Sequence, residues 1–449
     1  MVRKPLVNSS LTLLLALGCI PFLTGCGDTT APAVGQADPA ALDDESGVVT
    51  LGMPVPEQQP ERVPNPFAND SEGIVRVSGQ SNSGSIQTAA ASEAVSSSGT
   101  AKELLDQIAQ LRAAPIDVVK QPNPQAPGEF VEVQLAPEQI TAERNRRLYE
   151  ILDLAVQAVG KSFRDANHQE EFNAAIVYLA DTRMQLALIG DDQQGNLLQE
   201  DAETLFKQDP TSFAAVEAAF KLLQLTQFVA QQQSNDPRWS IAFARQSRMF
   251  AERFPQETSR VTVGLASAGR QADQLGQTEE ARLCYQTLRQ RYPESPFAQQ
   301  CEAVLRRLSL VGQPLVDFGG QAMDGGSVSV EHYLGKPMVI VFWSTESPQF
   351  RQDLPLLKQS LAKLGDNRVG VVGVNLDTDE QAVDQFLATN NFARQHIFYA
   401  DPGFRGPQNL VANYYGVSQV PTYWVVDREG KVVSIHASAE QLVPLLEGK

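Results

Sequence analysis

Apolar and polar positions follow three different patterns along the 449 residues of this chain. Residues 27 to about 100 show no apolar periodicity. From about 101 to 310, apolar residues recur every three or four positions, which is typical of amphipathic helices. From about 311 to the end, short apolar runs alternate with helical stretches, which predicts strands and helices in alternation. The pattern therefore predicts a helical region followed by an α/β domain.

The helical region is predicted to begin with a short helix near 101–112, followed by a proline-rich loop near 114–136. Beyond residue 137, apolar stripes recur and Asp-Pro or Gly-Asp pairs separate them, as expected of consecutive helices with short turns. One stripe contains Leu148, Ile151, Leu152, Ala155, Val156 and Val159, and another contains Phe172, Ala175, Ile176, Leu179, Met184 and Leu188.

Part of this region repeats itself. Arg-Phe-Pro at 253–255 recurs as Arg-Tyr-Pro at 291–293. The second copy resembles a tetratricopeptide repeat, in which small residues let two helices approach and an aromatic side chain fills the groove between them. The residues that carry this resemblance are Gly269, Gly276, Ala281, Tyr285, Leu288 and Pro293. A non-repeating helical bundle is the alternative. Arrays of this kind usually offer a concave surface to a partner.

The α/β region, residues 311–449, is predicted to contain several buried strands and three longer helices. Met338–Trp343 is a continuous apolar run, as a central strand requires. The other predicted strands are 327–330, 369–376, 397–399, 422–426 and 432–435. Helices are expected at 348–364, 380–389 and 439–447, with a short one before the last two strands.

Two segments of this region resemble membrane-tethered thioredoxins of the TlpA-like (redoxin) family. They are V-I-V-F-W-S-T-E-S-P-Q-F at 339–350 and G-V-S-Q-V-P-T at 416–422. The resemblance implies a thioredoxin-like α/β sandwich with a cis peptide bond before Pro421. In that family a C-P-x-C dithiol lies at the positions that Ser347 and Phe350 occupy here. We therefore expect a degenerate site without catalytic residues.

Disulfide exchange needs a thiolate at the helix N-terminus and a second thiol one turn further on. The Ser347 hydroxyl stays protonated without a base, and Phe350 carries no reactive group. Ser followed by Pro is a favoured helix start, so capping is the first interpretation of Ser347. Phe350 is expected to pack against Trp343 or Pro421. Glu346 would raise the pKa of any neighbouring thiol.

Active members of the family hold an extended substrate chain in a groove beside the dithiol, and loss of both thiols does not abolish the shape of that groove. We therefore expect a binding or scaffolding role, with envelope proteins or extended peptides as partners, and the alternative is an active thiol-disulfide oxidoreductase. The candidate groove residues are Trp343, Glu346, Ser347, Pro348, Gln349, Phe350, Val420, Pro421 and Thr422.

Two further cysteines, Cys284 and Cys301, lie in predicted helices at equal distances from the turn near residue 292. Three interpretations stay open: buried free thiols acting as small apolar residues, a structural disulfide, and a redox-active pair. The last is disfavoured because two thiols in the middle of helices lack the surroundings that lower a thiol pKa.

Charge and composition exclude several classes of function. A net charge of −17 repels phosphate backbones, so we expect no nucleic-acid partner. The four histidines are scattered and none lies near a cysteine, so we expect no metal site. No cofactor motif occurs.

The N-terminus resembles a bacterial lipoprotein signal. Arg3 and Lys4 precede an apolar stretch too short to span a bilayer, and Leu23-Thr24-Gly25-Cys26 follows. We expect cleavage after residue 25 and lipidation of Cys26, which anchors the chain to a bacterial membrane facing the periplasm or the surface. The signal is compatible with both the inner and the outer membrane. Residues 26–100 are then a disordered tether, and 101–310 the helical region.

Overall fold

The computed structural model describes residues 99–447, except 123–129, 164, 235, 317, 366–367 and 393–394. The predicted signal peptide, Cys26 and the tether up to residue 98 lie outside the described residues. Residues Glu61–Lys449 form one compact unit, and every described residue belongs to it.

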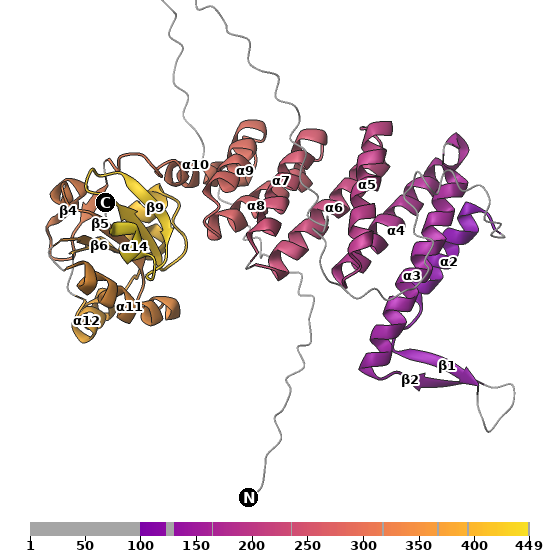
Figure 1. The fold of residues 1–449 in the computed structure, drawn as a ribbon, viewed down its shortest axis with the longest axis horizontal. Coiled ribbons are helices and arrows are strands. Elements are labelled where there is room, and N and C mark those ends of the chain that lie inside the picture. Colours follow the sequence, from indigo (N-terminus) through magenta and orange to yellow (C-terminus); the bar gives the residue numbers. More distant parts are fainter. Residues whose placement is uncertain are drawn as a thin grey trace, which may run out of the picture. The chain divides into compact units, whose positions relative to one another are not determined.

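Helices make up the first part of the described chain, and consecutive helices pack against each other (Figure 1). The predicted helix near 101–112 is confirmed as α2. The helices are α2 (Ala101–Ala113), α3 (Pro137–Ser162), α4 (Gln169–Leu188), α5 (Asp192–Gln208), α6 (Phe213–Gln232), α7 (Pro237–Arg253), α8 (Thr258–Gln274), α9 (Thr278–Arg291) and α10 (Pro296–Leu308). Helix α6 is long and apolar enough to cross a membrane, but most of it is buried inside the protein, as in a core helix.

Helices α8 and α9 approach closely because Gly269 has no side chain. A Cβ atom at Gly269 would lie 3.0 Å from the ring of Tyr285. The turn between the two helices places Gly276 at φ +69°, a conformation that glycine adopts without strain. Ala281 and Leu288 are fully buried on α9. The predicted packing of a small residue against an aromatic ring is therefore present in this helix pair.

The segment predicted as a loop near 114–136 contains a β-hairpin, so that prediction is wrong in part. Strands β1 (Val118–Pro122) and β2 (Phe130–Gln134) pair antiparallel, with Val118 opposite Gln134. The β-branched residues Val131 and Val133 favour a strand. The loop was predicted because the segment is rich in proline, and this outweighed the short β-branched pattern. Pro122 sits at the end of β1, where a missing N–H is tolerated.

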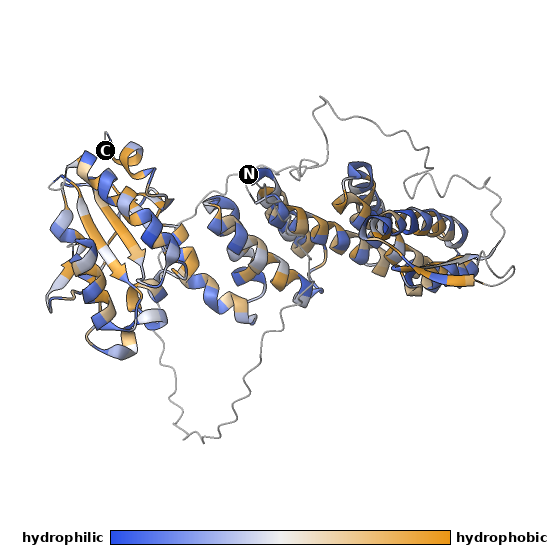
Figure 2. Cartoon of the chain, turned by 90° about the horizontal axis from the view of Figure 1, so that it is seen from below, coloured by the Kyte–Doolittle hydropathy of each residue, from blue (hydrophilic) through white to orange (hydrophobic). Residues whose placement is uncertain are grey.

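The C-terminal part is an α/β domain built on a five-stranded sheet of order β7-β6-β5-β8-β9. Strand β5 (Met338–Trp343) pairs parallel with β6 (Gly370–Asn375) and antiparallel with β8 (Thr422–Val426). All residues of β5 and β6 are buried, and the sheet is correspondingly apolar in Figure 2. The outer strands are β7 (Gln395–Ile397) and β9 (Val432–Ala437), and a separate pair consists of β3 (Gly319–Gln321) and β4 (Ser327–Ser329).

The helices of this domain are α11 (Pro348–Leu364), α12 (Glu380–Asn390), α13 (Leu410–Tyr414) and α14 (Leu442–Leu446). The predicted fold class, a helical region followed by a thioredoxin-like α/β sandwich, is confirmed. Strand β7 begins two residues before the predicted segment 397–399. Its first residue, Gln395, pairs in parallel with Val372 in β6. Helix α14 is shorter than the predicted helix at 439–447.

Candidate functional site

Ser347 lies between the end of strand β5 and the start of helix α11. Its hydroxyl Oγ accepts a hydrogen bond from the backbone N–H of Phe350 at 3.2 Å and donates one to the carbonyl oxygen of Val420 at 3.1 Å. The first bond is the predicted helix cap, which is confirmed. The second bond ties the helix start to the loop before Pro421.

This arrangement leaves the Ser347 hydroxyl without an activating base. A backbone carbonyl cannot take up the proton, and in the described part of the chain Ser347 has no hydrogen bond to a carboxylate or an imidazole. The side chain is also largely buried, with 8% of its surface exposed. The hydroxyl is therefore a structural bridge between the helix start and the loop before Pro421.

A buried carboxylate, Asp377, holds the loop that leads to Ser347. It accepts hydrogen bonds from the Ser344 hydroxyl at 2.6 Å, from the Thr345 N–H at 2.8 Å and from the Asn375 amide at 2.7 Å. Bonds of backbone and side-chain donors to a charged acceptor are stronger than neutral ones. Sequence reasoning missed this residue, although Asp377 follows closely after the buried strand β6 and that position was the available signal.

Phe350 and Trp343 belong to the core of the domain. Their ring centroids lie 5.0 Å apart, and Phe386 and Phe392 complete the aromatic cluster. Both side chains are completely buried. The expected packing of Phe350 against Trp343 is confirmed, and the assignment of these two residues to a partner-binding groove is wrong, since neither offers surface to a partner.

His396 lies against the same cluster. The Trp343 indole Nε1–H donates to His396 Nδ1 at 3.3 Å. Burial lowers the pKa of His396 to about 4, so the ring is neutral at physiological pH. A Cβ atom on Gly373 would lie 2.0 Å from His396 Nδ1, so this close approach requires glycine. The histidine fills the core and is not placed to act on Ser347.

The remaining candidate residues form a small surface around the helix start. Glu346, Pro348 and Gln349 are exposed, whereas Val420, Pro421 and Thr422 are half-buried. The peptide bond between Val420 and Pro421 is cis, as the family resemblance implies. These residues come from two segments that the Ser347–Val420 hydrogen bond holds together. They are the part of the predicted groove that a partner can reach.

Cys284 and Cys301 are free and buried, and the alternative of a disulfide between them is not realised. Cys284 Sγ faces helix α7, where the Arg248 guanidinium donates to it at 3.8 Å and the Ala244 carbonyl accepts from it at 3.7 Å. Cys301 Sγ instead donates to the Phe297 carbonyl of its own helix at 3.1 Å.

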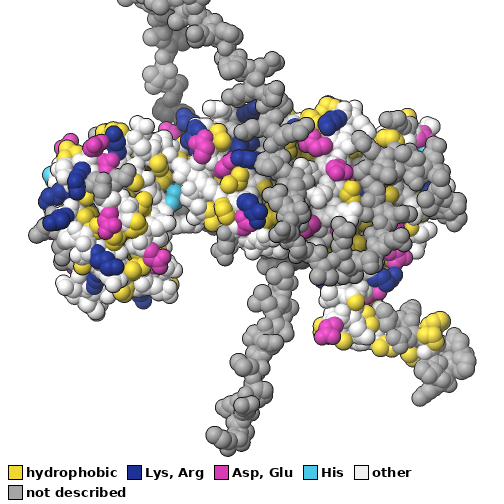
Figure 3. Space-filling model, in the orientation of Figure 1, with side chains coloured by type: hydrophobic (Ala, Val, Ile, Leu, Met, Phe, Trp, Pro, Cys, Tyr) yellow, Lys and Arg dark blue, Asp and Glu magenta, His cyan; other side chains and the backbone are white. Residues whose placement is uncertain are grey.

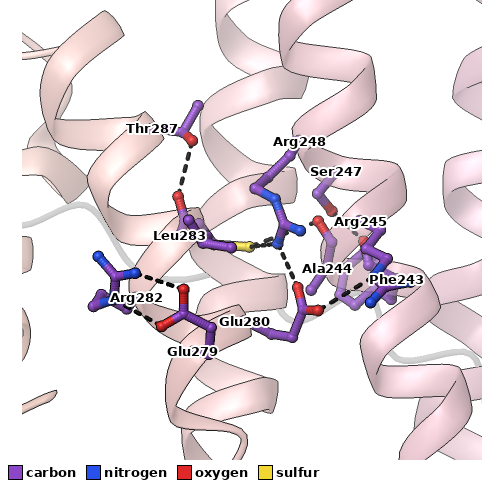
Figure 4. Close-up of polar contacts among 11 residues, drawn as sticks. Phe243, Ala244, Arg245, Ser247, Arg248, Glu279, Glu280, Arg282, Leu283 and Thr287 are labelled. Atoms are coloured by element: carbon purple, nitrogen blue, oxygen red, sulfur yellow. Dashed lines mark hydrogen bonds and ion pairs between the residues drawn. The ribbon is translucent and has the colours of Figure 1, made fainter. Parts of the chain in front are cut away.

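The surroundings of both thiols favour the protonated form. Burial raises the pKa of Cys284 to about 11, and although the Arg248 guanidinium opposes this shift, it is engaged at 2.7 Å with Glu280 (Figure 4). Burial also raises the pKa of Cys301 to about 11. A thiol of this kind has almost no thiolate at neutral pH, so it is a poor nucleophile for disulfide exchange. Among the described residues no group of three or more His, Cys, Asp or Glu side chains could hold a metal ion.

Comparison with known proteins gives a family match within the α/β domain. Residues 311–435 match the AhpC/TSA family. The thiol-disulfide oxidoreductase ResA of Halalkalibacterium halodurans is 24% identical over 140 residues, which cover 31% of this chain and 76% of that protein. The thioredoxin-like protein YneN of Bacillus subtilis is 27% identical over 125 residues, covering 28% and 70%.

Solved structures match over a similar share of the chain. A DsbF homologue from Corynebacterium diphtheriae is 23% identical, with a TM-score of 0.27, and the match covers 30% of this chain and 87% of that one. A DsbE-type thiol:disulfide interchange protein from Chlorobium tepidum is 28% identical, with a TM-score of 0.26, covering 30% and 94%. The C-terminal region is thus an AhpC/TSA-type thioredoxin-fold domain, homologous to ResA-like thiol-disulfide oxidoreductases.

Proposed function

We propose that this chain is a lipid-anchored protein of the bacterial cell envelope that binds other envelope proteins, and that its thioredoxin-like domain carries out no dithiol chemistry at its own site. In this role the domain holds a partner chain against the surface around the helix start. The contact residues are the exposed Glu346, Pro348 and Gln349 together with Val420, Pro421 and Thr422.

The observation that carries this proposal is the bonding of the Ser347 hydroxyl. It is engaged as donor and as acceptor by two backbone groups, and the side chain at the second cysteine position, Phe350, is buried among aromatic rings. An electron-carrying disulfide has no place to form there. The rigid loop that Asp377 holds supports binding, since a preorganised surface loses little entropy when a partner docks.

The proposed location rests on the N-terminal signal. The lipobox with Cys26 is the part of the sequence that supports an anchor. Lipidation at this cysteine follows export, so the folded part of the protein would lie outside the cytoplasm.

The second candidate function is thiol-disulfide exchange, because the relatives named ResA are oxidoreductases. In this chain it would require Cys284 and Cys301 to cycle. Their burial, their raised pKa values and their orientation toward different neighbours argue against it.

Site-specific photo-crosslinking in the native membrane tests the proposal. A crosslinking amino acid at Gln349 or Thr422 is expected to capture the same partner, whereas one at the exposed Gln381 on α12 is expected to capture none. Capture should persist under reductant and after thiol alkylation. A partner that is released by reductant would contradict the proposal, because it would show a mixed disulfide.

A further inference from the structure

Two cavities meet on the helical side of the α/β domain. The larger, about 600 Å³, lies between helices α8–α10 and the segment 416–423, and the smaller, about 360 Å³, extends along α6 and α8. Arg270 and Gln274 line both cavities, so the two adjoin at these residues, and together they are called the groove below. None of its lining residues belongs to 343–350, but Pro421 and Thr422 line the groove and also belong to the surface around Ser347, so the two surfaces adjoin.

The groove carries positive charge within a strongly acidic chain. Its one acidic lining residue, Asp273, is neutralised by Arg307 at 2.7 Å and lies 3.2 Å from His436. Arg270 is exposed and, in the described part of the chain, has no ion-pair partner. On the face drawn in Figure 3, Lys and Arg are interspersed with Asp and Glu, so no broad basic field covers that face.

Amide side chains make up much of the remaining polar lining. A glutamine amide can donate to a peptide carbonyl and accept from a peptide N–H, which matches the main chain of an extended peptide. The Gln271 amide nitrogen already donates to the Ala230 carbonyl at 2.8 Å, so the bonding capacity of this side chain is partly used within the protein. The lining glutamines are Gln227, Gln231, Gln271, Gln274, Gln300 and Gln419.

The wall that the α/β domain contributes is held in place by helix α10. Arg306 donates to the Tyr414 carbonyl at 2.5 Å and Arg307 to the Tyr415 carbonyl at 3.1 Å. Gly416, at φ +61°, packs so closely on Val304 that a Cβ atom would lie 2.9 Å from it. The two walls are therefore fixed relative to each other before any ligand binds, which lowers the cost of binding.

We infer that this groove binds an extended, acidic peptide segment of another protein, with Arg270 pairing a carboxylate and the glutamines bonding the peptide main chain. The occupant is acidic because the groove presents an unpaired guanidinium and a neutralised carboxylate, and a charge-assisted pair of this kind is the strongest contact available there. The inference rests on the proposed function for the premise that the chain binds proteins, and Pro421 and Thr422 belong to both surfaces. Arg270 and the lining glutamines lie outside the surface around Ser347.

Fluorescence anisotropy with the purified full-length chain tests this inference. The probe is a fluorescein-labelled peptide of alternating Ala and Glu, and the comparison peptide has Lys in place of Glu. We expect the Glu peptide to bind and the Lys peptide not to bind. Arg270→Glu should weaken binding by about tenfold or more, and Arg270→Lys by less. Arg291→Glu is the matched control, since Arg291 is exposed on α9 and lines neither cavity.

Equal binding of both peptides, or an unchanged affinity in Arg270→Glu, would overturn the inference. So would a Glu peptide that binds only after the acidic residues between 27 and 99 are replaced by amides, because the occupant would then be this chain's own segment. Crosslinking at Gln349 is independent of Arg270. Failure of the peptide assay with intact crosslinks therefore refutes the groove and leaves the proposed function standing.

Discussion

The Ser347 hydroxyl connects two segments of the α/β domain through two hydrogen bonds. In a dithiol site the first sulfur is a thiolate stabilised by the helix N-terminus. Here Oγ satisfies the Phe350 N–H and reaches across to the Val420 carbonyl, so the helix start and the cis-proline loop stay connected. A methyl group at this position would leave both backbone groups without that partner.

Ser347→Ala is expected to lower the free energy of unfolding by about 2 kcal/mol, since it removes a helix cap and a hydrogen bond between two segments. Asp379→Ala is the matched control: Asp379 caps α12 in the same domain without bonding a second element, so about 1 kcal/mol is expected. Chemical denaturation followed by tryptophan fluorescence measures both. Equal losses in the two variants would show that the bond to Val420 contributes nothing.

His396 is expected to make stability depend on pH. Its pKa is about 4 in the folded protein and about 6.5 when unfolded. The unfolded chain therefore binds a proton that the folded protein does not. Stability is full above pH 6.5 and is lost as the pH falls toward 4, by as much as about 3 kcal/mol. Denaturation midpoints at pH 7.5 and 4.5 measure this effect, and His396→Gln should reduce the difference. An unchanged difference in the variant would contradict the assignment.

Some residues of the site could be predicted from the sequence and others could not. Ser347 as a helix cap follows from its neighbour Pro348 and needs only local information. The contact of Phe350 with Trp343 was expected on similar grounds. Asp377 could not be found this way, because it bonds residues 32 and 33 positions earlier in the chain. His396 was equally unpredictable, since its role depends on a glycine in the adjacent strand.

At the scale of elements, strands buried on both faces were the easiest to predict. Met338–Trp343 and its neighbour β6 are continuous apolar runs in the sequence and match the structure within a residue. The hairpin of β1 and β2 was missed because its short alternating segments lie among prolines, and all of β2 is exposed. A strand without a buried face leaves little apolar signal.

The contact of α8 with α9 depends on Gly269. We expect Gly269→Ala to lower the free energy of unfolding by about 1–3 kcal/mol, because the new methyl group would meet the Tyr285 ring at 3.0 Å. Gly264→Ala is the matched control on the same helix: its Cβ would lie 3.3 Å from the terminal Cδ2 of Leu223 and 3.9 Å from Ser247 Oγ, with no aromatic ring in its way. The control is expected to be neutral or stabilising by up to about 1 kcal/mol, as alanine favours helix. Thermal and urea unfolding distinguish the two outcomes, and equal effects would contradict the tight packing.

At the scale of the whole molecule, the chain combines an acidic N-terminal segment, a helical region and a thioredoxin-fold domain. Contacts of Arg306 and Arg307 tie the last two together through backbone carbonyls of Tyr414 and Tyr415. No sequence pattern indicated this link, because side chain to backbone contacts between distant segments leave no periodic trace. The succession of a helical region and an α/β domain was predictable from apolar periodicity.

Membrane attachment is predicted to depend on Cys26 alone. Metabolic labelling with an alkyne fatty acid should label the chain in cells, and Cys26→Ala should abolish the label and release the protein from the membrane fraction. Cys19→Ala is the matched control, since Cys19 lies within the apolar part of the signal. It is expected to leave labelling unchanged. Labelling that survives Cys26→Ala would contradict the lipobox assignment.

The absence of electron-carrying sulfur at positions 347 and 350 is the claim on which the account depends. The most direct measurement is the rate of insulin reduction by the full-length chain in the presence of dithiothreitol, before and after alkylation of its thiols under denaturing conditions and refolding. We predict no rate above the reagent background in either case. A clear rate that persists when Cys284 and Cys301 are alkylated would contradict the account.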